Sequence, residues 1–104
     1  MLATRMSYFL RALALTALLS LAACQSAPVQ EMSDARQAIS VAKKAGAEKY
    51  APYDLKAALD YLRSAEGFIN ERQYKNARQD AVNAKASALE ALHASSEQSG
   101  KSPD

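Results

Sequence analysis

The sequence contains one cysteine, Cys24, which directly follows Leu21, Ala22 and Ala23. A thiolate is a strong nucleophile, so a cysteine can be redox-active, bind a metal or accept a covalent group. One cysteine cannot form a disulfide within its own chain, and a zinc site would need further cysteine or histidine ligands nearby. The residues around Cys24 therefore have to distinguish covalent modification from a buried or redox-active thiol.

The other groups capable of chemistry are scattered along the chain. His93 is the only histidine and lies near the end of a helical pattern, where a cation interacts favourably with the helix dipole. The three glycines stand singly at 46, 67 and 100, so there is no glycine loop for phosphate. The carboxylates alternate with basic residues, as on a solvated helix face, at Asp54, Asp60, Glu66, Asp80 and Glu90. We expect no catalytic residues, no metal site and no enzyme activity.

The segment before Cys24 has the pattern of a bacterial export signal. Arg5 and Arg11 form a basic start, and an apolar run of 12 residues follows from Ala12 to Ala23. A helix that crosses the hydrocarbon core needs about 20 apolar residues. A basic start, a short apolar run and small residues at its end are typical of a signal peptide. The pattern predicts that residues 1–23 form a cleaved N-terminal signal helix.

Residues 21–24 resemble the lipobox of bacterial lipoproteins, and the resemblance covers residues 1–26. It implies that Cys24 becomes the first mature residue, with a diacylglycerol on its sulfur and an acyl group such as palmitate on its amine. In that family an aspartate after the cysteine retains the protein in the inner membrane, whereas this chain has Gln25. The resemblance therefore implies a lipid anchor in the outer membrane, on its periplasmic face.

The mature chain, Cys24 to Asp104, has 81 residues and no net charge. The full chain has 13 basic and 11 acidic residues; without Arg5 and Arg11, 11 basic residues remain against 11 acidic ones. Nucleic-acid binding relies on a basic patch or stripe, which this balance does not favour. A chain of this length is sufficient for one small domain. We expect no nucleic-acid partner and no small-molecule substrate.

Three helices are predicted from apolar residues at helical spacing. The first begins at Ser33, a favourable N-cap, and ends near Gly46 or one turn later, after Ala47 to Lys49. The second begins at Pro52, because proline suits the first helical position, and continues to about Ile69. The third extends over about residues 74–96.

A short polar turn at residues 70–73 makes the second and third helices antiparallel neighbours. We therefore expect an all-α domain over residues 33–96, arranged as an antiparallel three-helix bundle or helical hairpin. Residues 24–32 are interpreted as the lipidated cysteine and its tether, and residues 97–104 as a disordered tail.

The third predicted helix has alanines at alternating steps of four and three, which would allow a neighbouring helix to approach closely. This predicted packing seam consists of Ala77, Ala81, Ala84, Ala88 and Ala91. Tyrosines lie around the predicted turns and either pack against the core or form an exposed interaction surface. They are Tyr50, Tyr53, Tyr61 and Tyr74.

Two family resemblances extend over these helices. Small and large residues alternate as in a tetratricopeptide repeat at Tyr61, Ala65 and Phe68, and then at Tyr74, Ala77, Ala81 and Ala84. The mature chain also resembles small lipoproteins that carry a DUF4398 domain, over about residues 31–95. The matching features are the alanine stripe from Ala35 to Ala45, the Ala51-Pro52 break, Leu59, Ala65 and the pattern Tyr74-x-x-Ala77-x-x-x-Ala81-x-x-Ala84. That resemblance implies no assigned catalytic activity.

These patterns predict a lipid-anchored periplasmic adaptor or accessory lipoprotein, non-catalytic, that binds an envelope protein through a helical surface. One alternative is a structural spacer that self-associates by pairing its alanine seam between chains. A further alternative is an activator of a cell-wall hydrolase. The covalent lipid on Cys24 is the one non-protein group expected.

Overall fold

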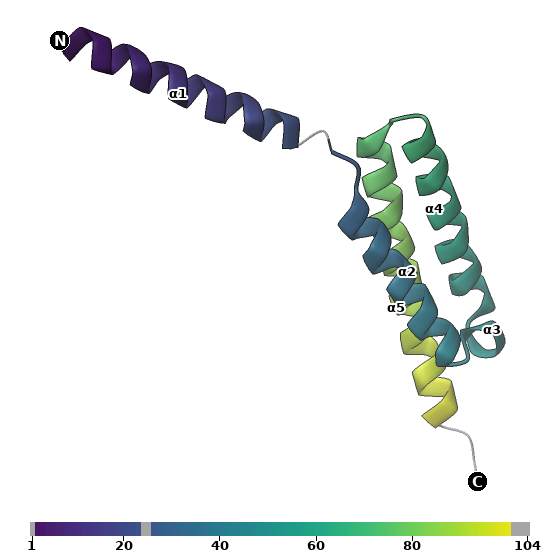
Figure 1. The fold of residues 1–104 in the computed structure, drawn as a ribbon. Helices are drawn as coiled ribbons and strands as arrows, with labels where there is room; N and C mark the ends of the chain where they lie inside the picture. The colour runs from purple at the N-terminus through teal and green to yellow at the C-terminus, as the bar shows by residue number, and fades with distance from the viewer. Residues whose placement is uncertain (1, 24–25, 101–104) are drawn as a thin grey trace.

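The computed structural model describes residues 2–23 and 26–100, and the side chains of residues 4–16 and 26–100. These residues form helices and contain no strand, so the predicted all-α class is confirmed. The helices are α1 (Leu2–Ala23), α2 (Val29–Lys44), α3 (Ala47–Tyr50), α4 (Pro52–Asn70) and α5 (Tyr74–Gly100), as drawn in Figure 1.

Helix α1 covers the predicted signal segment. Within the described part of the chain it makes no contact with α2 to α5, and its side chains at residues 4–16 are exposed. None of the helices in the described ranges combines the length and hydropathy needed to cross a membrane. The predicted lipidation site, Cys24, lies outside the described residues. Residues 26–100 are called the helical domain below.

Helix α5 is the central element of the helical domain. It contacts α2, α3 and α4, and its contacts with α2 and α4 are more extensive than those between α2 and α4. In Figure 1, α4 runs in the opposite direction to α2 and α5. Five alanines and one serine of α5 are buried in these contacts: Ala77, Ala81, Ala84, Ala88, Ala91 and Ser95.

Larger side chains from α2 and α4 cover this alanine surface. Ile39 and Leu55 belong to the cluster toward α3, while Met32 packs with Ala65 and Ala81 at the other end. Leu62 packs against both clusters. Burial of apolar surface contributes roughly 25 cal/mol per Å², so the few large side chains carry much of the hydrophobic stabilisation.

Helix α2 begins at Val29, four residues before the predicted start at Ser33. Pro28 is the N-cap and is fully buried, and its carbonyl accepts the Met32 N–H at 3.0 Å. Because Met32 packs into the core, the first turn is fixed by tertiary contacts rather than by a side-chain cap. The prediction that residues 24–32 form a tether is therefore wrong from Val29 onward.

The predicted helix break at Gly46 is confirmed, but a separate helical turn, α3, follows it. Gly46 has φ +90°, a conformation that residues with a Cβ rarely adopt. Its carbonyl accepts the N–H groups of Lys49 and Tyr50 at 3.0 Å. Ala51 has φ −144° and ψ 55°, outside the helical region, and α4 begins at Pro52 as predicted. The short α3 therefore reverses the chain between α2 and α4.

The turn between α4 and α5 comprises residues 71–73, close to the prediction. Arg72 has φ +61°, and the Gln73 N–H donates to the Phe68 carbonyl at 2.8 Å. At its other end α5 continues to Gly100, so the predicted tail at 97–104 is wrong for residues 97–100. Glutamate and glutamine are good helix formers, and Glu97 lies 3.4 Å from His93, one helical turn away.

The close packing of α5 predicts that replacing a buried alanine of this helix destabilises the protein much more than replacing an exposed one. Ala84→Leu inserts three carbons where the side chain is fully buried, and should lower the free energy of unfolding by about 1–3 kcal/mol. Ala86→Leu, on the exposed face, should change it by less than about 0.5 kcal/mol. Urea unfolding of both variants measures the difference, and equal stabilities would contradict the packing described above.

The surroundings of Gly46 and Gly67 predict that substitution by alanine has opposite effects on stability at the two positions. A Cβ on Gly46 would lie 3.2 Å from the Tyr50 ring in a backbone with positive φ, so Gly46→Ala should destabilise the protein by about 1–2 kcal/mol. Gly67 lies within α4 and an added Cβ meets nothing within 4 Å, so Gly67→Ala should stabilise it by about 0.5–1 kcal/mol. Thermal unfolding followed by circular dichroism measures both changes, and a shared sign would be inconsistent with these backbone conformations.

Candidate functional site

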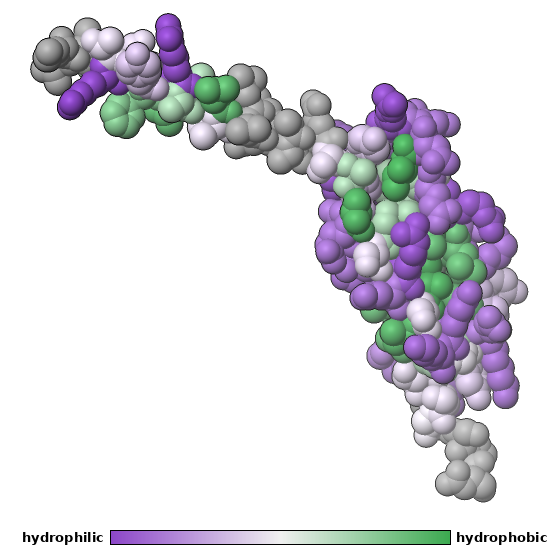
Figure 2. Space-filling view, in the orientation of Figure 1, coloured by the Kyte–Doolittle hydropathy of each residue, from purple (hydrophilic) through white to green (hydrophobic). Residues whose placement is uncertain are grey.

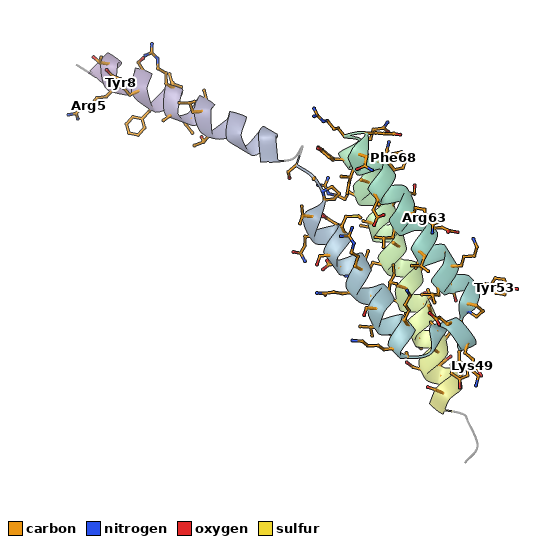
Figure 3. The ribbon with its side chains drawn as sticks, turned by 45° about the vertical axis from the view of Figure 1, so that its right-hand side comes forward. Arg5, Tyr8, Lys49, Tyr53, Arg63 and Phe68 are labelled. Atoms are coloured by element: carbon orange, nitrogen blue, oxygen red, sulfur yellow. The ribbon has the colours of Figure 1, made fainter. Side chains whose placement is uncertain are left out.

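The four tyrosines of the predicted interaction surface lie on different parts of the helical domain. Tyr50 ends α3, Tyr53 and Tyr61 are on α4, and Tyr74 begins α5. Tyr53 is 88% exposed and Tyr61 39% exposed, whereas Tyr50 and Tyr74 are half-buried. Figure 3 labels Tyr53 at one end of α4 and Phe68 near the other, which is the end where α5 begins. The tyrosines therefore do not form one continuous surface.

The predicted seam alanines lie inside the helical domain. Ala77, Ala81, Ala84, Ala88 and Ala91 have no exposed surface. Ser95 continues the series, and its hydroxyl donates to the Ala91 carbonyl at 2.7 Å. This face of α5 is therefore used for packing within the chain.

A groove of about 390 Å³ lies between α2 and α4, and we call it the basic groove. Ile39, Leu59 and Leu62 are its apolar lining, which we call the floor. Its other lining residues are Arg36, Ser40, Lys43 and Lys44 of α2, and the three basic ones are called the rim. In Figure 2, hydrophobic residues show between α2 and α4, with hydrophilic residues on both sides. The basic groove arises because α2 and α4 both pack on α5 and less on each other.

The three basic residues of the rim differ in their partners. Arg36 Nη2 lies 3.3 Å from Glu66 Oε1 across the groove, and both side chains are about half exposed. Lys43 and Lys44 are exposed, and neither forms an ion pair within the part of the chain that the structure describes. Both lie in the last turn of α2, where their positive charges interact favourably with the negative end of the helix dipole. The basic groove thus keeps positive charge that no carboxylate within the domain neutralises.

A second groove of about 390 Å³, the acidic groove, lies between α4 and α5 and includes Tyr61, Asp60, Ser64 and Asp80. Its charges have partners. Lys56 Nζ donates to Asp60 at 2.8 Å, and this hydrogen bond holds the pKa of that carboxyl below its ordinary value. Partial desolvation opposes the shift, and the charges of Lys56 and Arg63 support it. Ser64 donates its hydroxyl hydrogen to Asp80. The acidic groove therefore presents less unmatched charge than the basic one.

Arg78 of α5 holds the N-terminal end of the helical domain. Its Nη2 donates to the Ser26 carbonyl at 3.2 Å, and its Nε donates to Glu31 Oε1 at 3.2 Å. Pro28, which lies between Ser26 and Glu31 in the sequence, is buried, and Ala27 is half-buried. The segment that leaves the domain toward position 24 is thus fixed on α5 from Ser26 onward.

The side chains considered for catalysis are dispersed. His93 is largely exposed, with Glu97 as its neighbour. In the described ranges, no three histidine, cysteine, aspartate or glutamate side chains are grouped as metal ligands. Glu66 and Asp60 form ion pairs with basic residues, and Asp80 bonds to a hydroxyl.

Sequence reasoning missed the basic groove, although one signal was present. Arg36 and Lys43 lie three residues before and four residues after Ile39, and Lys44 lies four residues after Ser40, so all three share one side of α2. The contact between Arg78 and Ser26 joins residues 52 positions apart, and no local pattern indicates it.

Comparison with known proteins gives one match. The family model described as a domain of unknown function, DUF4398, matches residues 30–102. No curated protein and no solved structure matches the chain.

The Arg78 contacts predict a local effect on the N-terminal segment. Arg78→Met keeps most of the aliphatic bulk but removes both donors, so the amides of Val29 and Met32 should exchange hydrogen several-fold faster. The loss of global stability should be at most about 1 kcal/mol, because this ion pair is partly exposed.

Arg63→Met is the matched control, since Arg63 contacts only Asp60 of its own helix among the ion pairs described. Hydrogen-exchange mass spectrometry of both variants measures the effect. Unchanged exchange at residues 29–32 in Arg78→Met would show that Arg78 does not hold the segment.

Proposed function

The chain belongs to the DUF4398 family, and from that premise we propose that it is a lipid-anchored, non-catalytic adaptor of the bacterial cell envelope. Its helical domain binds an envelope protein through the basic groove. Its anchor is the diacylglycerol and N-acyl lipid on Cys24, and its location is the periplasmic face of the outer membrane. Neither a nucleic acid nor a small-molecule substrate is part of this function.

The anchor is supported by the sequence around Cys24. A basic start, a short apolar run and Leu21-Ala22-Ala23 precede this cysteine, and Gln25 follows it. Each buried lipid methylene contributes about 0.8 kcal/mol, so two or three acyl chains hold a protein on a membrane permanently. With Ser26 already fixed on α5, the adaptor stays close to the bilayer.

We also propose that the helical domain is an antiparallel three-helix bundle of the tetratricopeptide kind. Helices α4 and α5 would form the hairpin of one repeat, and α2 would cover it where a neighbouring repeat normally packs. The burial of Ala65 and Ala81 in one cluster, opposite Met32 of α2, supports this arrangement.

The observation that carries the adaptor function is the basic groove. It combines an apolar floor with a polar rim, an arrangement that protein interfaces share, and its two lysines have no carboxylate partner in the described residues. The spacer alternative has less support, because the alanine seam is covered by α2 and α4. Pairing that seam between chains would require α5 to separate from its neighbours. Activation of a cell-wall hydrolase would be one form of the adaptor function.

An affinity pull-down of the tagged, lipidated protein from detergent-solubilised envelopes tests this function. The wild-type protein should retain a specific partner, and Ser40→Trp, which fills the basic groove, should retain at least tenfold less. Gln37→Trp places the same side chain on an exposed position of α2 outside the groove lining and should behave like wild type.

Cys24→Ala removes the proposed lipid attachment site and should reduce recovery of a membrane-confined partner. If Ser40→Trp retained the partner as well as Gln37→Trp does, the basic groove would not be the binding surface. Recovery of the protein alone in every sample would favour the self-associating spacer over the adaptor.

A further inference from the structure

We infer that the basic groove receives an amphipathic helix with acidic flanks from the partner protein. This inference rests on the proposed adaptor function and adds the chemistry of the partner segment. It depends on three properties of the groove: its length, its unmatched charge and its concave form.

The length of the basic groove fits two turns of a helix. On α2 its lining extends from Arg36 to Lys44, which corresponds to about 12 Å at 1.5 Å per residue. A helix that inserts apolar residues at positions i, i+4 and i+7 presents them over about 10.5 Å. Leu59 and Leu62 supply the facing side, one turn apart on α4. The floor can therefore contact one such row of side chains.

The charge of the groove selects the flanks of that helix. Lys43 and Lys44 have no ion pair within the described part of the chain, and Arg36 has one partner, Glu66, in a half-exposed contact. A carboxylate on an incoming helix would meet two lysines without displacing an existing ion pair. The acidic groove offers a basic helix less, since Lys56 and Arg63 already pair with Asp60 and its other carboxylate, Asp80, accepts the Ser64 hydroxyl.

The concave form of the groove favours a helix over a bilayer surface. Ile39 is 5% exposed and Leu62 is half-buried, so the floor lies below the lysine side chains. Side chains that project from a helix can reach this floor, as in other helix-in-groove complexes. Peripheral membrane binding instead relies on an apolar face that inserts into the lipid.

The test uses the lipidated full chain in nanodiscs of phosphatidylcholine and two fluorescent helical peptides. Both peptides carry leucine at i, i+4 and i+7; one has glutamates on its flanks and the other has lysines. The acidic peptide should bind at least tenfold more tightly by fluorescence anisotropy, and its affinity should fall as salt is raised from 50 to 500 mM. The basic peptide should bind weakly at every salt concentration.

Charge reversal identifies the surface. Lys43→Glu/Lys44→Glu should weaken binding of the acidic peptide at least tenfold, whereas Lys75→Glu/Lys85→Glu, with the same change in net charge outside the groove, should leave it within twofold. Lys43→Gln/Lys44→Gln is a milder second variant, with an intermediate loss expected. Circular dichroism checks that each variant keeps the helical content of the wild type.

Equal binding of the two peptides, no binding of the acidic peptide, or equal effects of the two charge reversals would overturn the inference. Tighter binding of the Cys24→Ala chain, which lacks the proposed lipid attachment site, to nanodiscs that contain anionic phosphatidylglycerol than to the acidic peptide would also overturn it and assign the lysines to the membrane. The pull-down partner could be lost with Ser40→Trp but retained with Lys43→Glu/Lys44→Glu. That result would support the adaptor function and contradict only the inference that the partner segment is an acidic helix.

Discussion

The contact of α5 with both of its long neighbours is the constraint on which the rest of the helical domain depends. Each seam residue of α5 offers only a methyl group, so α2 and α4 must approach closely to exclude water from it. Alanine buries little apolar area, and larger side chains such as Ile39, Leu55 and Met32 complete the core from the other helices. Because α2 and α4 are both oriented toward α5, the space between them stays open as the basic groove.

Local signals in the sequence were sufficient for most of the helix boundaries. Gly46, Pro52 and the polar turn before Tyr74 act within a few residues, so their effects can be read without knowledge of the fold. Helix α2 starts before the predicted position because a buried Met32 outweighs the capping preference of Ser33. Helix α5 extends past its predicted end because polar residues such as Glu97, which are also common in tails, sustain an exposed helical turn.

The candidate site was less accessible to sequence reasoning than the fold. Aromatic residues suggested an interaction surface, but Tyr53 and Tyr74 are placed at opposite ends of the α4–α5 hairpin. A groove is a property of two helices together, and its position follows from how α2 and α4 meet α5. The side chains of Arg36 and Lys43 indicated only that one face of α2 is basic beside Ile39. Cys24 lies outside the described residues, so its assignment continues to depend on the sequence alone.

The 11 basic and 11 acidic residues of positions 24–104 balance, but their charges are not evenly paired. Asp60 of α4 is paired with Lys56 and Arg63, and Asp80 of α5 accepts the Ser64 hydroxyl, whereas Lys43 and Lys44 on α2 have no counterpart among the described ion pairs. Two exposed lysines give an attraction that salt screens readily, at a Debye length of about 8 Å in physiological salt. They orient an acidic segment, increase its rate of encounter and disfavour a basic one, so they contribute to specificity more than to total affinity. Much of the affinity must then come from the fit of apolar side chains to Ile39, Leu59 and Leu62, so partner choice depends both on these lysines and on the groove shape that the alanine seam sets.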